Sequence, residues 1–133
     1  MYLARSRIFV ADDNPAFLRE LASLLAAEFD VVATATDGRS ALDLIRRYKP
    51  DLVVLDLAMP VLNGIEVTRE LAMSSSSPPV VICSVETDPE VVGAARKAGA
   101  AAYVFKIRVQ KELVLALKSA LQGKPFVSPS SIQ

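Results

Sequence analysis

The stretch Leu52–Gly64 reads LVVLDLAMPVLNG, and it contains an apolar run, an aspartate and an Asn-Gly pair. Its first four residues are apolar and do not alternate with polar residues, which predicts a short strand buried on both faces. Asp56 follows this strand directly, and the pair Asn63-Gly64 comes shortly after it. Taken alone, an aspartate in this position is typical of a turn or a helix cap. Its meaning therefore depends on the residues that come after the other strands.

Four more apolar runs of this kind lie on both sides of this stretch and predict four further strands. They are Ile8–Ala11, Val31–Ala33, Val80–Cys83 and Ala102–Phe105. Segments with the apolar spacing of helices follow the five strands, the third of them from about Gly64 to Ala72. This strict alternation predicts one α/β domain, a doubly wound sandwich built on a parallel five-stranded sheet.

Residues of the kind that begin and end helices support this alternation. Asn14-Pro15 and Asp88-Pro89 place an N-cap residue before a proline, which predicts the starts of the first and fourth helices. Gly99 and Gly123 predict the ends of the fourth and fifth helices. The first helix carries apolar residues on one face, from Phe17 to Phe29. We expect this face to pack against the sheet.

The composition excludes several kinds of chemistry. The 133 residues contain 15 Lys+Arg, 15 Asp+Glu, one cysteine and no histidine. The lack of histidine excludes a Ser-His-Asp triad, a histidine base and histidine-ligated zinc. Cys83 lies in an apolar run, which predicts a buried, unreactive thiol and fits a cytoplasmic location. Zero net charge and no basic block argue against direct nucleic-acid binding, and no apolar run approaches the roughly 20 residues that span a membrane.

Polar residues follow four of the five predicted strands. They are Asp12 and Asp13, Asp56, Ser84, and Lys106. Because the carboxyl ends of parallel strands meet at one edge of a sheet, we expect these side chains to converge there. Neighbouring carboxylates repel one another, and an all-oxygen site suits Mg²⁺ or Mn²⁺ better than zinc. A carboxylate nucleophile beside a hard cation, a hydroxyl and an ammonium group favours phosphoryl transfer.

These motifs resemble the receiver domain of two-component response regulators over residues 7–122. Phe9–Pro15 is similar to the family's acidic-pair motif, and Val53–Gly64 is similar to its phospho-acceptor motif. The resemblance implies a flavodoxin-like (βα)5 fold with strand order 2-1-3-4-5. It also implies a receiver domain over residues 1–122, followed by a tail or the start of an interdomain linker over residues 123–133.

The resemblance further implies a role for each matched residue. Asp56 is the phospho-acceptor, which takes a phosphoryl group from a sensor histidine kinase. Asp12 or Asp13, together with Asp56 and the backbone carbonyl of Ala58, holds Mg²⁺, for which Mn²⁺ is a substitute. Lys106 is the catalytic lysine. Ser84 is both a catalytic and a switch residue through its hydroxyl, and Tyr103 is the aromatic switch residue. Such a domain is not an enzyme, because it catalyses only its own phosphorylation and dephosphorylation.

The end of the sequence indicates a branch of the family. Ala102–Lys106, Glu112-Leu113 and Gly123–Pro129 are similar to the receivers that precede a LuxR-type helix-turn-helix domain. This implies that phosphorylation changes the surface of the fourth helix, fifth strand and fifth helix. That change controls a DNA-binding output domain which these residues do not include. The sequence leaves open whether the chain is an excised domain or a whole single-domain regulator, and whether it forms a homodimer.

Three residues depart from the family pattern. Ile107 stands where many receivers have a cis proline, so we expect a trans peptide bond there. Val85 is larger than the usual residue after Ser84 and is expected to narrow access to the acceptor. Ala58 has no polar side chain that could position a hydrolytic water.

Two other functions are compatible with parts of the sequence. A receiver fold can act as an interaction module that does not depend on phosphorylation. A Mg²⁺-dependent aspartyl phosphatase of the haloacid dehalogenase type also uses an aspartate after an apolar strand, but it needs a second aspartate where Ala58 lies.

Overall fold

The expected alternation of strands and helices is present in the computed structural model, which describes residues 5–129. The strands are β1 (Arg7–Ala11), β2 (Asp30–Ala35), β3 (Leu52–Leu55), β4 (Val80–Ser84), β5 (Ala102–Phe105) and β6 (Phe126–Val127). The helices are α1 (Pro15–Leu25), α2 (Gly38–Tyr48), α3 (Gly64–Ala72), α4 (Pro89–Ala98) and α5 (Val109–Leu121), with a 3-10 turn, η1 (Lys106–Arg108), before α5. None of the helices in this part of the chain has the length and apolar character needed to cross a membrane.

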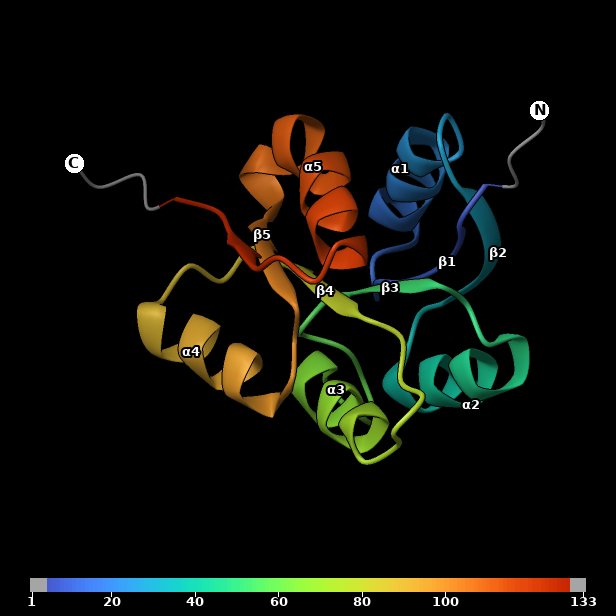
Figure 1. Cartoon of the computed structure of the whole chain (residues 1–133), viewed down its shortest axis with the longest axis horizontal. Coiled ribbons are helices and arrows are strands. Elements are labelled where there is room, and N and C mark those ends of the chain that lie inside the picture. The colour runs from blue at the N-terminus through green and yellow to red at the C-terminus, as the bar shows by residue number, and fades with distance from the viewer. Residues whose placement is uncertain (1–4, 130–133) are drawn as a thin grey trace.

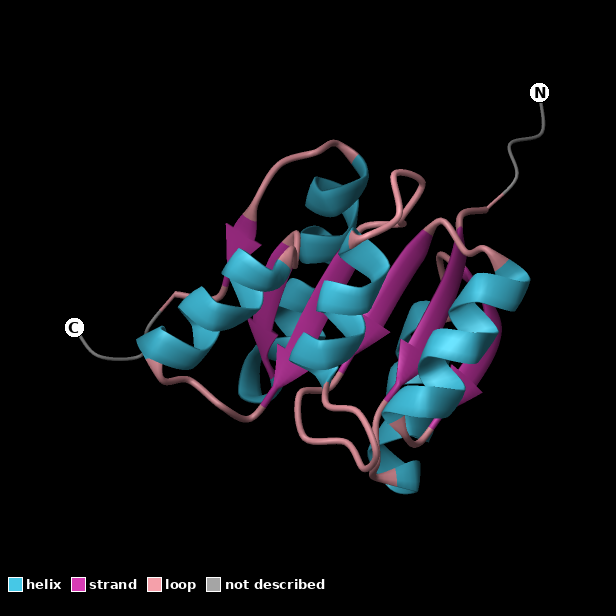
Figure 2. Cartoon of the chain, turned by 90° about the horizontal axis from the view of Figure 1, so that it is seen from below, coloured by secondary structure: helices cyan, strands magenta, loops and turns pink. Residues whose placement is uncertain are grey.

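All pairs of neighbouring strands in the sheet are parallel (Figure 2). Their order is β2-β1-β3-β4-β5-β6. The predicted order of the first five strands is therefore confirmed, and so is the flavodoxin-like fold class. The sixth strand is an addition that the sequence did not indicate. It pairs with β5 through Phe126 and Val127, so part of the tail expected over residues 123–133 belongs to the sheet, and residues 130–133 lie outside the described residues.

Helices cover both faces of the sheet. Figure 1 shows α1 and α5 on one face and α2, α3 and α4 on the other. Side chains alternate between the two faces along each strand. In β1, Ile8 and Val10 pack under α1 and α5, whereas Phe9 and Ala11 pack against the opposite helices. The sheet is thus apolar on both sides, as expected for a strand run without polar alternation.

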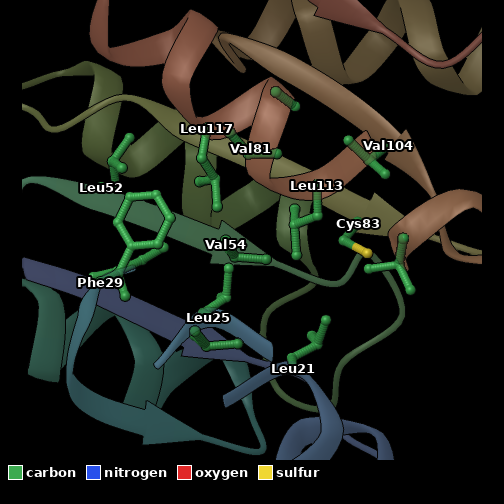
Figure 3. Close-up of a cluster of buried hydrophobic side chains, with 14 of the residues drawn as sticks. Leu21, Leu25, Phe29, Leu52, Val54, Val81, Cys83, Val104, Leu113 and Leu117 are labelled. Carbon is green, nitrogen blue, oxygen red and sulfur yellow. The ribbon is translucent and has the colours of Figure 1, made fainter. Parts of the chain in front are cut away.

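The core beneath α1 and α5 contains the lone cysteine. Figure 3 shows Cys83 among Leu21, Val54 and Leu113. The side chain is buried, as the sequence predicts, and burial raises the pKa of its thiol to about 12. The thiol is therefore protonated at neutral pH, which makes it a packing group in the core.

The predicted helix caps are present. The Asn14 side chain accepts hydrogen bonds from two N–H groups at the start of α1, and the Asp88 side chain accepts one at the start of α4. Gly99 ends α4 with a φ of 120°, a backbone conformation that L side chains rarely adopt. Asn63 and Glu66 form a reciprocal capping box at α3. The loop after β3 therefore enters α3 in a fixed geometry.

Gly64 lets this loop close tightly over the end of β3. A Cβ atom at Gly64 would lie only 2.2 Å from the backbone carbonyl oxygen of Asp56. The Gly64 N–H donates a hydrogen bond to the Leu57 carbonyl at 2.9 Å. Only a residue without a side chain permits this approach, so the Asn63-Gly64 pair sets the position of α3 against the backbone of Asp56.

Candidate functional site

The carboxyl ends of β1, β3 and β5 bring together four of the residues that follow the strands. Asp12, Asp13 and Asp56 each offer a carboxylate oxygen, and these oxygens all lie within 4.8 Å of one another. Lys106 places its Nζ 2.8 Å from Asp12 Oδ2 and 3.0 Å from Asp56 Oδ2. Asp12 and Asp56 are buried, whereas Asp13 is exposed. The cluster therefore opens to solvent on the side of Asp13.

The pairing of β1 with β3 places Asp12 and Asp56 side by side. Ala11 and Leu55 are partners in the parallel register, so the next residue of each strand leaves the sheet at the same level. The Asp56 N–H donates to the Ala11 carbonyl at 3.0 Å. Asp12 Oδ1 accepts a hydrogen bond from the Asn14 N–H at 2.9 Å. The backbone that begins α1 thus orients one of the two buried carboxylates.

Burial and charge act in opposite directions on these groups. Burial raises the pKa of Asp56, the hydrogen bond from Lys106 opposes this, and the nearby charge of Asp12 adds to it, so that the net pKa is raised. Burial acts to lower the pKa of Lys106, but the two buried carboxylates outweigh it, and the net pKa is raised. Lys106 is therefore charged at neutral pH. The cluster then contains one ammonium group and three carboxylates, so a further cation would offset the remaining negative charge.

One buried carboxylate oxygen in the cluster is paired with the Lys106 ammonium. Asp12 Oδ2 accepts no hydrogen bond of ordinary geometry from residues 5–129, although the Lys106 ammonium lies 2.8 Å away. The ammonium compensates the negative charge of this buried oxygen. Three carboxylates and no nitrogen or sulfur ligand suit a hard divalent cation such as Mg²⁺. The residues present therefore fit the predicted metal, while the Ala58 carbonyl stays a predicted ligand.

Ser84 and Tyr103 form hydrogen bonds with a backbone segment after β4. The Ser84 hydroxyl accepts a hydrogen bond from the Glu86 N–H at 3.1 Å. The Tyr103 hydroxyl donates to the Glu86 carbonyl at 2.7 Å. Tyr103 is completely buried, and burial raises the pKa of its phenol. Both predicted switch residues thus bind the backbone of one residue, Glu86.

The three residues that depart from the family pattern, Ala58, Val85 and Ile107, are all exposed. The side chains of Val85 and Ile107 are 76% and 91% exposed, respectively. Every peptide bond between residues 5 and 129 is trans, so the expected trans bond after Lys106 is confirmed.

Val61, in the loop after β3, is 74% exposed and has a φ of 71°. This left-handed conformation is rare for a β-branched residue.

Three contacts in the structure were not predictable from sequence patterns. The ring of Phe17 lies under the Lys106 ammonium, although spacing alone places Phe17 on the core face of α1. The backbone of Glu86 joins Ser84 and Tyr103, and no motif marks it. Ser128 is buried against β5, in a segment that reads as an exposed tail. No pattern marks this serine as buried, because it lies between prolines and after a glycine, which are typical of loops.

The sequence matches proteins of one family along most of its length. A family model described as the response regulator receiver domain matches residues 8–118. The transcriptional regulatory protein DegU of Brevibacillus brevis is 34% identical over 125 residues, which are 92% of this chain and 53% of DegU. The probable transcriptional regulatory protein NarL of Mycobacterium tuberculosis is 32% identical over 128 residues, which are 95% of this chain and 59% of NarL. The chain therefore spans a little over half the length of these curated relatives.

Solved structures agree with the sequence matches. The signal receiver domain of NarL from Mycobacterium tuberculosis superposes with a TM-score of 0.87 at 30% identity, over 92% of this chain and 100% of that domain. A LuxR-family two-component response regulator from Aurantimonas superposes with a TM-score of 0.89 at 33% identity, over 95% of this chain and 91% of that one. These likenesses also bear out the predicted LuxR-type branch. This chain belongs to the response regulator receiver domain family.

Proposed function

We propose that this receiver domain is a phospho-accepting signalling switch whose acceptor is Asp56. A carboxylate oxygen of Asp56 attacks the phosphorus atom of a phosphohistidine on a sensor histidine kinase. The new O–P bond forms while the P–N bond to the imidazole breaks, and the imidazole nitrogen keeps that electron pair. The observation that supports this proposal is the meeting of three carboxylates and one ammonium at the carboxyl end of the sheet.

Asp12, Asp13 and Asp56 would hold Mg²⁺, or Mn²⁺ in its place, with the Ala58 carbonyl as a further ligand. When bound, the cation supplies positive charge that neutralises the carboxylates and the phosphoryl oxygens. Lys106 supplies a second positive charge, first at Asp56 and then at a phosphoryl oxygen. The buried position of Asp56 keeps the acyl phosphate away from bulk water.

The signal leaves the site through the β4–α4 loop. On phosphorylation, the Ser84 hydroxyl would release the Glu86 N–H and donate to a phosphoryl oxygen. Tyr103 is bound to the carbonyl of the same Glu86, so a shift of this residue reaches both α4 and β5. The proposed readout is a changed surface over α4, β5 and α5.

The partner that reads this surface is proposed to be a DNA-binding output domain. The chain spans a little over half of DegU and NarL, both of which are named as transcriptional regulatory proteins. The receiver itself would contact no DNA and would catalyse only its own phosphorylation and dephosphorylation.

Labelling with a small phosphodonor tests the proposal. Acetyl phosphate with Mg²⁺ is expected to add one phosphoryl group to the wild type, measured by intact-protein mass spectrometry. Asp56→Asn should show no adduct, and chelation of Mg²⁺ should prevent the adduct in the wild type. Asp43→Asn, which changes an exposed aspartate of α2, serves as the matched control. An equal adduct on Asp56→Asn and the wild type would contradict the proposal.

Two exposed apolar side chains favour a second candidate, an interaction module that does not depend on phosphorylation. Val85 follows Ser84 and Ile107 follows Lys106 in the sequence, and a partner could bury both side chains. Binding to a partner kinase that is unchanged by Asp56→Ala, together with no phosphoryl adduct on the wild type, would favour this candidate.

A further inference from the structure

The Lys106 ammonium has an aromatic neighbour besides its two carboxylates. Its Nζ lies 4.5 Å from the centroid of the Phe17 ring, well inside the range of a cation–π interaction. Phe17 lies in the first turn of α1, and its N–H donates to the Asn14 side chain at 3.1 Å. The helix cap therefore fixes the backbone position of Phe17. The loop that contains Asp12 and Asp13 leads directly into this first turn of α1.

The ammonium is confined by three groups of different kinds. Asp12 and Asp56 hold it through charge at 2.8 Å and 3.0 Å, and Phe17 holds it through the face of a neutral ring. The Lys106 side chain is only 15% exposed, so water competes weakly for it. A cation–π interaction is stronger where the cation is desolvated. The ring therefore contributes to the position of the charge as well as to packing.

The ring and the carboxylates differ in what else they can bind. Asp12 and Asp56 belong to the oxygen cluster that fits a divalent cation. A phenyl ring does not compete for a hard cation, whose preferred ligands are oxygens. Phe17 can thus hold the ammonium close to Asp56 even when the carboxylates have a second positive partner.

We propose that Phe17 is a positioning residue for phosphoryl transfer, because its ring holds the Lys106 ammonium beside the acceptor carboxylate. This inference rests on the proposed function. Phe17 does not touch the reacting atoms itself, and it acts through Lys106. The ring face is the property that matters, so tyrosine at this position should work and leucine should not.

The test compares Phe17→Leu with Phe17→Tyr. In the metal-free proteins, NMR should show the Lys106 Hε protons shifted by the ring current in wild type and Phe17→Tyr, and this shift should be lost in Phe17→Leu. At saturating Mg²⁺ and acetyl phosphate, the labelling rate of Phe17→Leu should be about two- to fivefold lower than wild type, with Phe17→Tyr close to wild type. Leu24→Val, another partly buried α1 residue, controls for lost packing and should leave the rate unchanged.

A double-mutant cycle separates positioning from packing. In the Lys106→Met background, Phe17→Leu should cause no further loss of rate, because the ammonium that the ring holds is gone. An equal loss in both backgrounds, or a loss in Phe17→Tyr as large as in Phe17→Leu, would overturn the inference. A wild type that takes no phosphoryl group would instead overturn the proposed function, and the NMR comparison would still report the contact.

Discussion

At the scale of single residues, Asp56 has an unfavourable side-chain environment and Val61 has an unfavourable backbone conformation. Asp56 is a buried carboxylate next to another carboxylate, and burial is the main reason why its pKa is raised from the ordinary value of 3.8. Val61 is a β-branched residue with a φ of 71°. Both lie in the segment that starts at Asp56, so the region proposed to react is also a region that lowers the stability of the fold.

Asp56→Asn is expected to raise the free energy of unfolding at pH 7 in metal-free buffer. A carboxylate with a raised folded pKa binds protons more tightly in the native state, so it lowers stability above that pKa and has no such effect below the unfolded value of 3.8. The gain from Asp56→Asn should therefore shrink as the pH falls toward 3.8. Urea unfolding at several pH values with a chelator measures this difference. Lower stability of Asp56→Asn at pH 7 would show that the bond from Lys106 outweighs burial.

Val61→Gly is expected to stabilise the domain by about 1 kcal/mol, because glycine adopts positive φ without strain. Val61→Asn should also stabilise it, since asparagine tolerates this conformation better than valine. Urea unfolding of both variants measures the change. Val85→Asn, at a similarly exposed residue without positive φ, is the control and should change stability by less than about 0.5 kcal/mol. No gain in either variant at Val61 would contradict the strain that its φ implies.

At the scale of elements, the junctions of helices and strands determine the site. The N-terminus of α3 presses on the backbone of Asp56 through Gly64, and β6 fixes the outer edge of β5. Neither junction contributes a reacting group. Each nevertheless sets the position of a strand end from which a proposed functional side chain extends, namely Asp56 after β3 and Lys106 after β5.

Gly64→Ala is expected to destabilise the domain by about 2–3 kcal/mol, because the new Cβ would meet backbone atoms that cannot turn away. It should also reduce labelling of Asp56, since α3 has to move away from the backbone of this proposed acceptor. Gly93→Ala in α4 is a matched control, because a Cβ there meets no atom within 4 Å. That control should raise stability by about 0.5–1 kcal/mol. Thermal or urea unfolding, with mass spectrometry of the labelled proteins, compares the two.

Ser128→Ala is expected to destabilise the domain by about 1–3 kcal/mol through loss of buried hydrogen bonds. The Ser128 hydroxyl accepts from the Phe105 N–H at 3.0 Å and donates to the Glu112 carboxylate. Alanine would leave both of these groups without that partner. Ser75→Ala, in the exposed loop after α3, is the control and should change stability little. Equal stability of the two variants would show that the hydrogen bonds of the Ser128 hydroxyl do not stabilise the domain.

Sequence patterns predicted helices and strands well where several residues, such as caps and periodic apolar positions, indicated the same element. The caps Asn14 and Asp88, the end at Gly99 and the bounds of α3 all agree with the structure. The pattern could not predict β6, because two residues after a proline show no periodicity. Nor could it predict that Ser84 and Tyr103 share Glu86 as a partner, because backbone contacts of a loop depend on how the folded strands meet.

At the scale of the whole molecule, charge is balanced overall but uneven in space. The chain has 15 basic and 15 acidic residues, yet three carboxylates lie together at one edge of the sheet with one lysine. The sequence predicted this meeting because the fold brings the ends of parallel strands together. It could not predict the contact of Lys106 with the ring of Phe17, since apolar spacing along a helix marks burial and does not identify a neighbour.

Mg²⁺ is expected to stabilise the folded domain as a whole. A ligand that binds only the native state adds about 2.7 kcal/mol to the free energy of unfolding at a concentration about one hundred times its Kd. Thermal unfolding of the wild type should therefore shift upward with added Mg²⁺, and a chelator should reverse the shift. Asp12→Asn should weaken the shift, and Asp43→Asn should retain it. An equal shift in Asp12→Asn would place the bound cation elsewhere.

The short strand β6 also covers the edge of β5, where the strand of another copy of the protein could otherwise pair. β5 would otherwise be an outer strand, with the N–H of Phe105 and the carbonyl of Tyr103 free to pair with another chain. In the structure, Ser128 occupies both groups. A protein shortened to end before Phe126 would present this row to solvent and should aggregate more readily. A segment that contributes no reacting group to the site thus reduces the tendency of the protein to aggregate.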